Sequence, residues 1–174
     1  MIKRAVCTSL TMLLASGGAE VQGRSGADTA ADTWIFSETE SPLDYAPVTI
    51  ASAWSNAAVE GQAMQVSIQC RRGRTDLLIF SPALTGRVEQ ALVSYAVDEA
   101  QPIPLASAPA PAGTGIAIKG DVVRLLTSLP PRGEVEFHVA QSQGAPLDGQ
   151  YNLPALSTVL DRLIAPCKWP SRNP

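Results

Sequence analysis

The sequence predicts a mainly β fold: an antiparallel β-sandwich-like or rolled sheet with a C-terminal helix packed on it. The first observation is a series of short apolar or alternating segments that are separated by turn residues. The second is the lack of a regular alternation between strands and helices, which favours antiparallel pairing. The segments with strand character are residues 48–54, 64–70, 75–80, 92–97, 116–118, 134–140 and 150–151.

The clearest strand covers residues 64–70. Apolar residues occupy every second position from Met64 to Cys70, and this period of two predicts one buried face and one face in water. The turn Arg72-Gly73 then returns the chain into the apolar residues 75–80, so the two segments predict a hairpin. We therefore expect the sulfur of Cys70 on the buried side of the sheet.

Two segments have helical spacing. The stronger one carries apolar residues at i, i+3, i+4, i+7 and i+8, namely Leu156, Val159, Leu160, Leu163 and Ile164. Asn152 can cap the start of this helix, and Pro166 is expected to mark its end. A shorter helix is predicted at residues 121–129, and the Ala- and Pro-rich residues 102–115 predict an extended loop.

The N-terminus has the three parts of a secretory signal peptide. Residues 3–4 are basic, an apolar run extends over residues 5–15, and small residues follow at 16–19. The run is shorter than the roughly 20 residues that a membrane span needs. The alternative is a buried N-terminal helix, but no helix cap precedes the run. We expect cleavage after Ala19 or after Gly23 and export to the bacterial periplasm.

These features divide the chain into four predicted parts: a signal peptide at residues 1–23, a flexible leader at 24–33, a single β-rich domain at 34–169 and a tail at 170–174. Removal of residues 1–23 leaves 11 basic residues (13 − 2) and 15 acidic residues (16 − 1), a net charge of −4. Nucleic-acid binding usually demands a basic surface. Since no other stretch is long and apolar enough to cross a membrane, we expect neither a nucleic-acid partner nor a stable membrane span.

Two cysteines remain after this cleavage, Cys70 and Cys167. An even number in an exported chain predicts a disulfide, and the alternative is two buried free thiols. The loop-entropy relation gives such a closure roughly 4–5 kcal/mol of stabilisation. Two cysteines and one distant histidine, His138, do not have the spacing of zinc ligands. The sequence therefore predicts a disulfide and no metal site.

No residue pattern predicts catalysis or a cofactor. His138 lies on the polar face of a predicted strand, and the chain has no G-x-S-x-G motif to hold a nucleophilic serine. The candidate carboxylates for acid–base chemistry are Asp44, Asp98, Glu134 and Glu136, and nothing in the sequence pairs them. We therefore expect that the protein needs no cofactor.

The densest charge cluster follows the predicted strand at residues 64–70 and consists of Arg71, Arg72, Arg74 and Asp76. Guanidinium groups bind carboxylates and phosphates through two parallel hydrogen bonds. The cluster is thus a candidate site for an anionic ligand or an acidic partner surface. The alternative is a solvated hairpin tip whose charges discourage strand pairing at the sheet edge.

Tryptophan is the other residue type that often anchors interfaces. The chain has three tryptophans, Trp34, Trp54 and Trp169, and only 5% of its residues are aromatic. Because so few aromatic residues are available for the core, we expect at least two of the three to be core residues.

Five short motifs follow one another along the chain in a familiar order. They are Ser-Pro-Leu-Asp at residues 41–44, Ile-Gln-Cys at 68–70 with Arg-Thr-Asp at 74–76, Val-Ser-Tyr-Ala-Val-Asp at 93–98, Tyr-Asn-Leu-Pro-Ala-Leu at 151–156, and Cys-Lys-Trp at 167–169. Together they resemble the periplasmic accessory proteins of type VI secretion, of the TagO or VasI type, over residues 34–169. Ala96 and His138 stand where the family pattern has arginine, and Ala155 replaces a glycine.

The resemblance implies an accessory or interaction role without catalytic residues. The leading hypothesis is thus an exported periplasmic accessory or interaction protein that has a protein partner in the bacterial envelope and is associated with type VI secretion or the cell envelope. The alternative is a periplasmic module that binds a small anionic ligand at the arginine cluster. A hydrolase with a non-standard site is the third hypothesis, and it would need two carboxylates facing one cleft.

Overall fold

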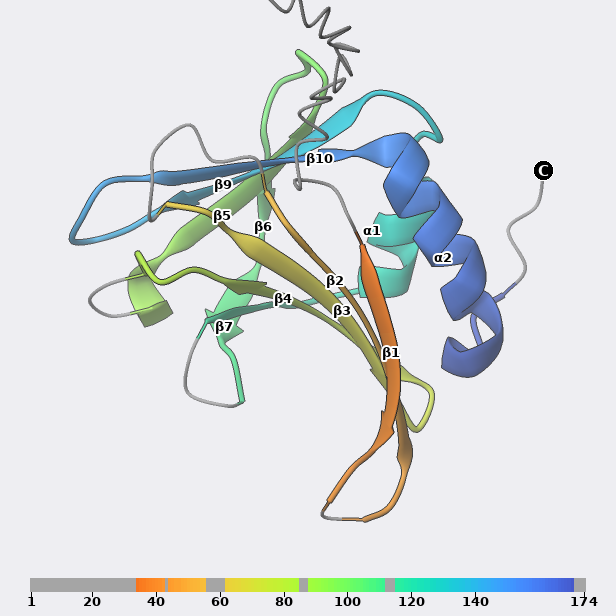
Figure 1. Ribbon diagram of the computed structural model, residues 1–174. Coiled ribbons are helices and arrows are strands. Elements are labelled where there is room, and N and C mark those ends of the chain that lie inside the picture. Colours follow the sequence, from red (N-terminus) through yellow and green to blue (C-terminus); the bar gives the residue numbers. More distant parts are fainter. Residues whose placement is uncertain (1–33, 43, 56–61, 85–87, 112–114, 171–174) are drawn as a thin grey trace, which may run out of the picture.

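The computed structural model describes residues 34–42, 44–55, 62–84, 88–111 and 115–170 (Figure 1). The predicted signal peptide and flexible leader lie outside these residues, as does nearly all of the predicted tail. Within them, every pair of neighbouring strands is antiparallel, and two helices complete the fold. The predicted mainly β, sandwich-like architecture with a C-terminal helix packed on it is confirmed.

The strands form two sheets (Figure 1). The six-stranded sheet has the order β1 (Ile35–Glu40), β2 (Pro47–Trp54), β3 (Gln65–Arg71), β4 (Arg74–Phe80), β8 (Ile116–Ile118) and β7 (Ser107–Pro109). The four-stranded sheet has the order β10 (Leu147–Asn152), β9 (Glu134–Ala140), β5 (Leu92–Val97) and β6 (Ile103–Leu105). A 3₁₀ turn, η1 (Val88–Gln90), precedes β5, and the helices are α1 (Val122–Ser128) and α2 (Leu153–Cys167).

The chain passes from one sheet to the other at Ala106, the single residue between β6 and β7. The prediction of an extended loop over residues 102–115 is therefore wrong where these two short strands form. Both strands contain proline, which lacks the N–H that a central strand would use on both sides. Each strand lies at the edge of its sheet, which is the position in a sheet where proline is tolerated.

Both predicted helices form, with capped ends. The side chain of Asn152 accepts a hydrogen bond from the Ala155 N–H at 3.3 Å, as predicted for α2. The predicted end at Pro166 is wrong, because the helix continues to Cys167. Lys168, in the left-handed conformation with φ 55°, ends the helix and donates its N–H to the Ala165 carbonyl at 3.2 Å. A proline in the last turn removes one hydrogen bond, and the C-terminal cap still closes the helix.

The core lies between the inner face of the six-stranded sheet, the four-stranded sheet and the helices. Residues on the predicted apolar faces point inwards, as seen for Val66, Ile68, Leu160 and Leu163. The core also contains Leu77, Val135, Phe137 and Val139. Tyr151 is the largest fully buried side chain, and its hydroxyl donates to the Met64 carbonyl at 2.8 Å. Ser67 is an exception to the predicted alternation, because it faces the other side of β3 and is still only 2% exposed. Other residues of the chain therefore cover the part of the outer face around Ser67.

The C-terminal end of α2 is fastened to the β3–β4 hairpin. Cys70 and Cys167 form the predicted disulfide, with their Cα atoms 5.3 Å apart. Next to it, the Trp169 indole N–H donates to the Thr75 hydroxyl at 2.7 Å, and Thr75 is the cross-strand neighbour of Cys70. These four residues, Cys70, Thr75, Cys167 and Trp169, form what we call the C-terminal clasp. Among the described residues, neither helix has the length and hydropathy required to cross a membrane.

Candidate functional site

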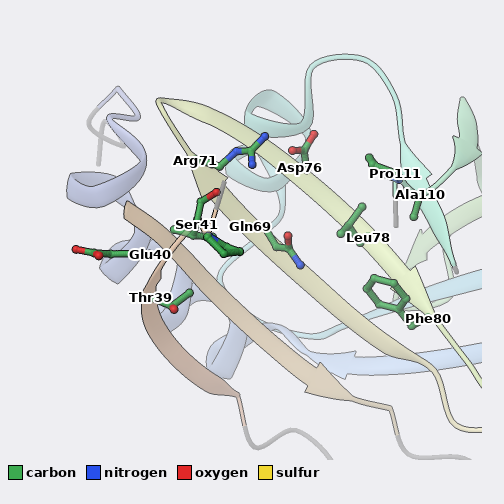
Figure 2. Close-up of a pocket in the computed structure, with 12 residues that line it drawn as sticks. Thr39, Glu40, Ser41, Gln69, Arg71, Asp76, Leu78, Phe80, Ala110 and Pro111 are labelled. Carbon is green, nitrogen blue, oxygen red and sulfur yellow. The ribbon is translucent and has the colours of Figure 1, made fainter. Parts of the chain in front are cut away.

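A groove lies on the outer face of the six-stranded sheet, the face turned away from the helices (Figure 2). We call it the outer groove, and its volume is about 400 Å³. It is lined by Thr39, Glu40, Ser41 and Pro42 at the end of β1, by Val48, Gln69, Arg71, Asp76, Leu78 and Phe80 from β2, β3 and β4, and by Ala110 and Pro111 after β7.

The strand period of two places these side chains outside. Gln69 and Arg71 alternate along β3 with Ile68 and Cys70, which belong to the core. In β4, the register sets Asp76 directly opposite Gln69. The strands that build the core with one set of residues therefore present the groove with the other set.

The four predicted site residues lie near the charged end of the groove, but only two of them line it. Arg72 pairs with Asp44 at 2.8 Å, and Arg74 pairs with Asp76 at 3.2 Å. Arg71 and Asp76 line the groove, whereas Arg72 and Arg74 do not. Within the part of the chain that the structure describes, Arg71 has no carboxylate within ion-pair distance. Arg71 is therefore the guanidinium that remains available to a ligand.

Asp44 holds the tip of the β1–β2 hairpin beside this end. A hydrogen bond from the Ser41 side chain is the largest effect that lowers the pKa of Asp44 below its ordinary value. The Ala46 N–H and the positive charges of Arg72 and Arg71 act on the pKa in the same direction, while burial opposes them. Ser41 and Asp44 of the Ser-Pro-Leu-Asp motif are thus hydrogen-bonded to each other, and the Asp44 carboxylate binds the next hairpin through Arg72.

The opposite end of the groove is apolar. Leu78, Ala110 and Ala117 form a small buried cluster on the outer face, with Phe80 packed against it. Ala117 lies opposite Leu78 in the β4–β8 register, so β8 and the chain after β7 cover this part of β4. The cluster also explains the burial of Ser67, which pairs with Leu78.

Gln69 joins the two ends of the groove. Its side-chain N–H donates to the Ser67 hydroxyl at 3.3 Å, which leaves its carbonyl oxygen as an acceptor. We did not predict Gln69, Leu78 or Phe80 as site residues. A signal was present, since three consecutive apolar residues from Leu77 to Ile79 are typical of a strand that is covered on both faces.

Large apolar side chains continue beyond the groove on the same face. Trp54 is 41% exposed and lies in the same cross-strand row as Gln65 and Phe80. Ile35, on the edge strand β1, is 59% exposed. Trp34 and Trp169 pack against the core, as expected for at least two of the tryptophans. Trp54 is therefore the tryptophan available for an interface.

A second polar feature crosses the four-stranded sheet. Ser94, His138 and Asp148 lie opposite one another on β5, β9 and β10, and the His138 Nδ1 contacts the Asp148 carboxylate. The order resembles a catalytic triad, but no hydrogen bond joins Ser94 to His138 among the described residues. Ser94 also lies within a paired strand, where backbone N–H groups serve the ladder and form no oxyanion hole. We assign no chemistry to this row.

Three of the candidate carboxylates meet in space. Asp98, Glu134 and Glu136 line one surface hollow of about 590 Å³, a proximity that the sequence did not indicate. Asp98 has a structural role, because its carboxylate accepts a hydrogen bond from the Glu134 N–H at 2.9 Å. In the described ranges, no group of three or more His, Cys, Asp or Glu residues is arranged to hold a metal ion.

The outer groove thus combines a guanidinium that has no ion-pair partner among the described residues, a central amide and an apolar floor. Such an arrangement can bind an anionic group at one end and an apolar group at the other. Comparison with family models, curated proteins and solved structures finds no match for this chain.

Proposed function

We propose that this chain is an exported periplasmic accessory protein that binds a partner protein of the bacterial envelope through the outer groove. The observation that carries the proposal is Arg71, which has no ion-pair partner among the described residues and lies at the rim of a partly apolar groove on an open sheet face. Arginine and tryptophan are enriched where protein interfaces are most strongly bound. Trp54 and Ile35 extend the apolar surface past the groove, which favours a protein over a small ligand.

Export is supported by the basic, apolar and small-residue parts of the N-terminus. The Cys70–Cys167 disulfide is compatible with an oxidising compartment such as the periplasm. The order of five motifs resembles accessory proteins of type VI secretion. We therefore propose that apparatus, or the envelope around it, as the place to look for the partner.

Binding of a small anionic ligand is the second candidate function. The groove volume of about 400 Å³ lies within the usual range for ligand pockets, and Arg71 could bind an anion there. A thermal-shift screen with anionic metabolites tests this function. A rise in the melting temperature that is lost in Arg71→Gln would favour it, and an unchanged melting temperature would count against it.

Site-specific photo-crosslinking in intact cells tests the leading proposal. The photoreactive amino acid p-benzoylphenylalanine replaces Trp54 or Ile50, which both lie on the outer face of β2. Leu92 is the matched control, because it is 74% exposed and lies on the four-stranded sheet. We expect the same envelope protein to be crosslinked from both β2 positions and not from Leu92, with mass spectrometry identifying it. Equal products from all three positions, or none, would overturn the proposal.

A further inference from the structure

We infer that the partner presents an extended segment of about five residues to the outer groove, with a carboxylate at the Arg71 end and an apolar side chain at the Leu78–Phe80 end. The inference rests on the proposed function and specifies the chemistry of the partner. It follows from the charges, the spacing and the central amide of the groove.

The charges leave one positive group for the partner. Three arginines lie at the tip of the β3–β4 hairpin, and two of them are paired, Arg72 with Asp44 and Arg74 with Asp76. The third arginine is Arg71, which lines the groove. Figure 2 shows Arg71 directed towards the Asp76 side of the groove, whereas Glu40 extends away from it. A planar guanidinium in this setting matches a carboxylate through two hydrogen bonds.

The spacing sets the length of the segment. Asp76, beside the charged end, and Phe80, at the apolar end, are separated by four positions along β4. A strand rises about 3.4 Å per residue, so the two ends lie roughly 14 Å apart. An extended peptide covers that distance in about four steps, that is, with about five residues whose first and last side chains lie on the same face.

The middle of the groove favours a peptide over a hydrocarbon chain. A carboxylate with a long acyl chain would also match the two ends. It would, however, cover the Gln69 carbonyl oxygen with methylene groups, and burial of an unpaired amide is unfavourable. The backbone N–H of an extended peptide can donate to that oxygen instead. The described residues give the Gln69 side chain one hydrogen bond, through its N–H to Ser67, so its carbonyl remains an acceptor.

The test uses the purified full chain and an array of short synthetic peptides. Each peptide carries Glu or Asp at one position and Leu or Phe four positions away, in either order, so that both side chains lie on one face of the extended chain, and its matched peptide carries Gln or Asn in place of the acid. Dodecanoate serves as the acyl-chain competitor. We expect the acidic peptides to bind more tightly than their amide counterparts. Excess dodecanoate should leave that binding unchanged.

Two variants of one hairpin tip provide the internal control. Arg71→Gln should weaken binding of the acidic peptide about tenfold, because it removes the charged partner of the carboxylate. Arg74→Gln removes the same charge from the same tip but should change binding less than about twofold, because Arg74 is already engaged by Asp76. Arg71→Lys should give an intermediate loss, since lysine keeps the charge without the planar fork. Circular dichroism and the melting temperature verify that each variant is folded.

Each outcome decides between the two proposals. Equal binding of acidic and amide peptides, equal losses in Arg71→Gln and Arg74→Gln, or displacement by dodecanoate would overturn the inference about the segment. A crosslinked envelope protein at Trp54 together with any of those results would leave the proposed function standing. Absence of the crosslink would overturn the proposed function itself.

Discussion

The two faces of the β3–β4 hairpin differ sharply, although they alternate residue by residue. The inner face carries Cys70 and Thr75, which are bound to Cys167 and Trp169 through a disulfide and a hydrogen bond. The outer face carries Arg71, whose guanidinium has no ion-pair partner in the described part of the chain. The difference teaches that one strand can hold the fold together with one set of side chains and leave the next set free to bind.

The interactions on the two faces also differ in size. A disulfide that closes a long loop contributes several kcal/mol, whereas an exposed ion pair contributes about 0–1 kcal/mol. The pairs Arg72–Asp44 and Arg74–Asp76 belong to the second class, because both arginine side chains are largely exposed. We therefore expect substitutions on the inner face to change stability and those on the outer face to change binding.

The largest expected effect is loss of the disulfide. The double variant Cys70→Ala/Cys167→Ala should lower the free energy of unfolding by up to about 4–5 kcal/mol, because the 97-residue separation makes the loop entropy large. Urea denaturation under non-reducing conditions measures the change. Arg71→Gln, the neighbouring residue on the other face, is the control and should leave the midpoint unchanged. A double variant as stable as the natural chain would contradict the assignment of stability to the inner face.

The adjacent residues Leu77 and Leu78 sharpen the comparison within a single strand. Leu77 is fully buried in the main core, and Leu78 belongs to the small cluster on the outer face. Leu77→Ala should cost about 2–5 kcal/mol of unfolding free energy, and Leu78→Ala should cost less because water in the groove can fill the space. Denaturation midpoints for the two variants measure both changes. If Leu78→Ala were the more destabilising, the outer cluster would have to be counted as part of the core.

A smaller effect is expected at the hydrogen bond of the clasp. Trp169→Phe keeps most of the buried ring but removes the indole N–H that binds Thr75, so the loss should be about 1 kcal/mol. Thr75→Val removes the acceptor and should give a similar loss. Because both variants remove the same interaction, the double variant should be less destabilised than the sum of the two. Strict additivity in this cycle would show that the bond does not contribute.

The smallest effect concerns pH and the outer hairpin tip. The lowered pKa of Asp44 means that the folded chain binds its proton less tightly than the unfolded chain. Its contribution to stability is therefore present above the ordinary pKa and is lost as the pH falls through the lower, folded value. Denaturation midpoints measured from neutral to acidic pH should fall more for the natural chain than for Asp44→Asn. Parallel curves for the two proteins would contradict this contribution.

Much of the fold was predictable because its signals are local. Alternation from Met64 to Cys70, helical spacing from Leu156 to Ile164 and the cap at Asn152 each depend on neighbouring residues. The predictions that were wrong concern prolines at sheet edges and at a helix end. The prolines that indicated a loop are accommodated in β6 and β7 because both are edge strands, and Pro166 is accommodated because a cap follows within two residues.

The sequence by itself determined most of the strands, the two helices, the pair of cysteines and the cluster of three arginines at one hairpin tip, but not the strands β1, β6 and β7. Only the tertiary structure decided which arginine remains available, because Asp44 reaches Arg72 from another hairpin. It also decided that Leu78 and Phe80 form the floor of a groove, since Ala110 and Ala117 pack beside Leu78 from 32 (110 − 78) and 39 (117 − 78) residues further along the chain. The physical reason is the same in both cases: periodicity and capping act between neighbours in the chain, whereas ion pairing and packing act between neighbours in space.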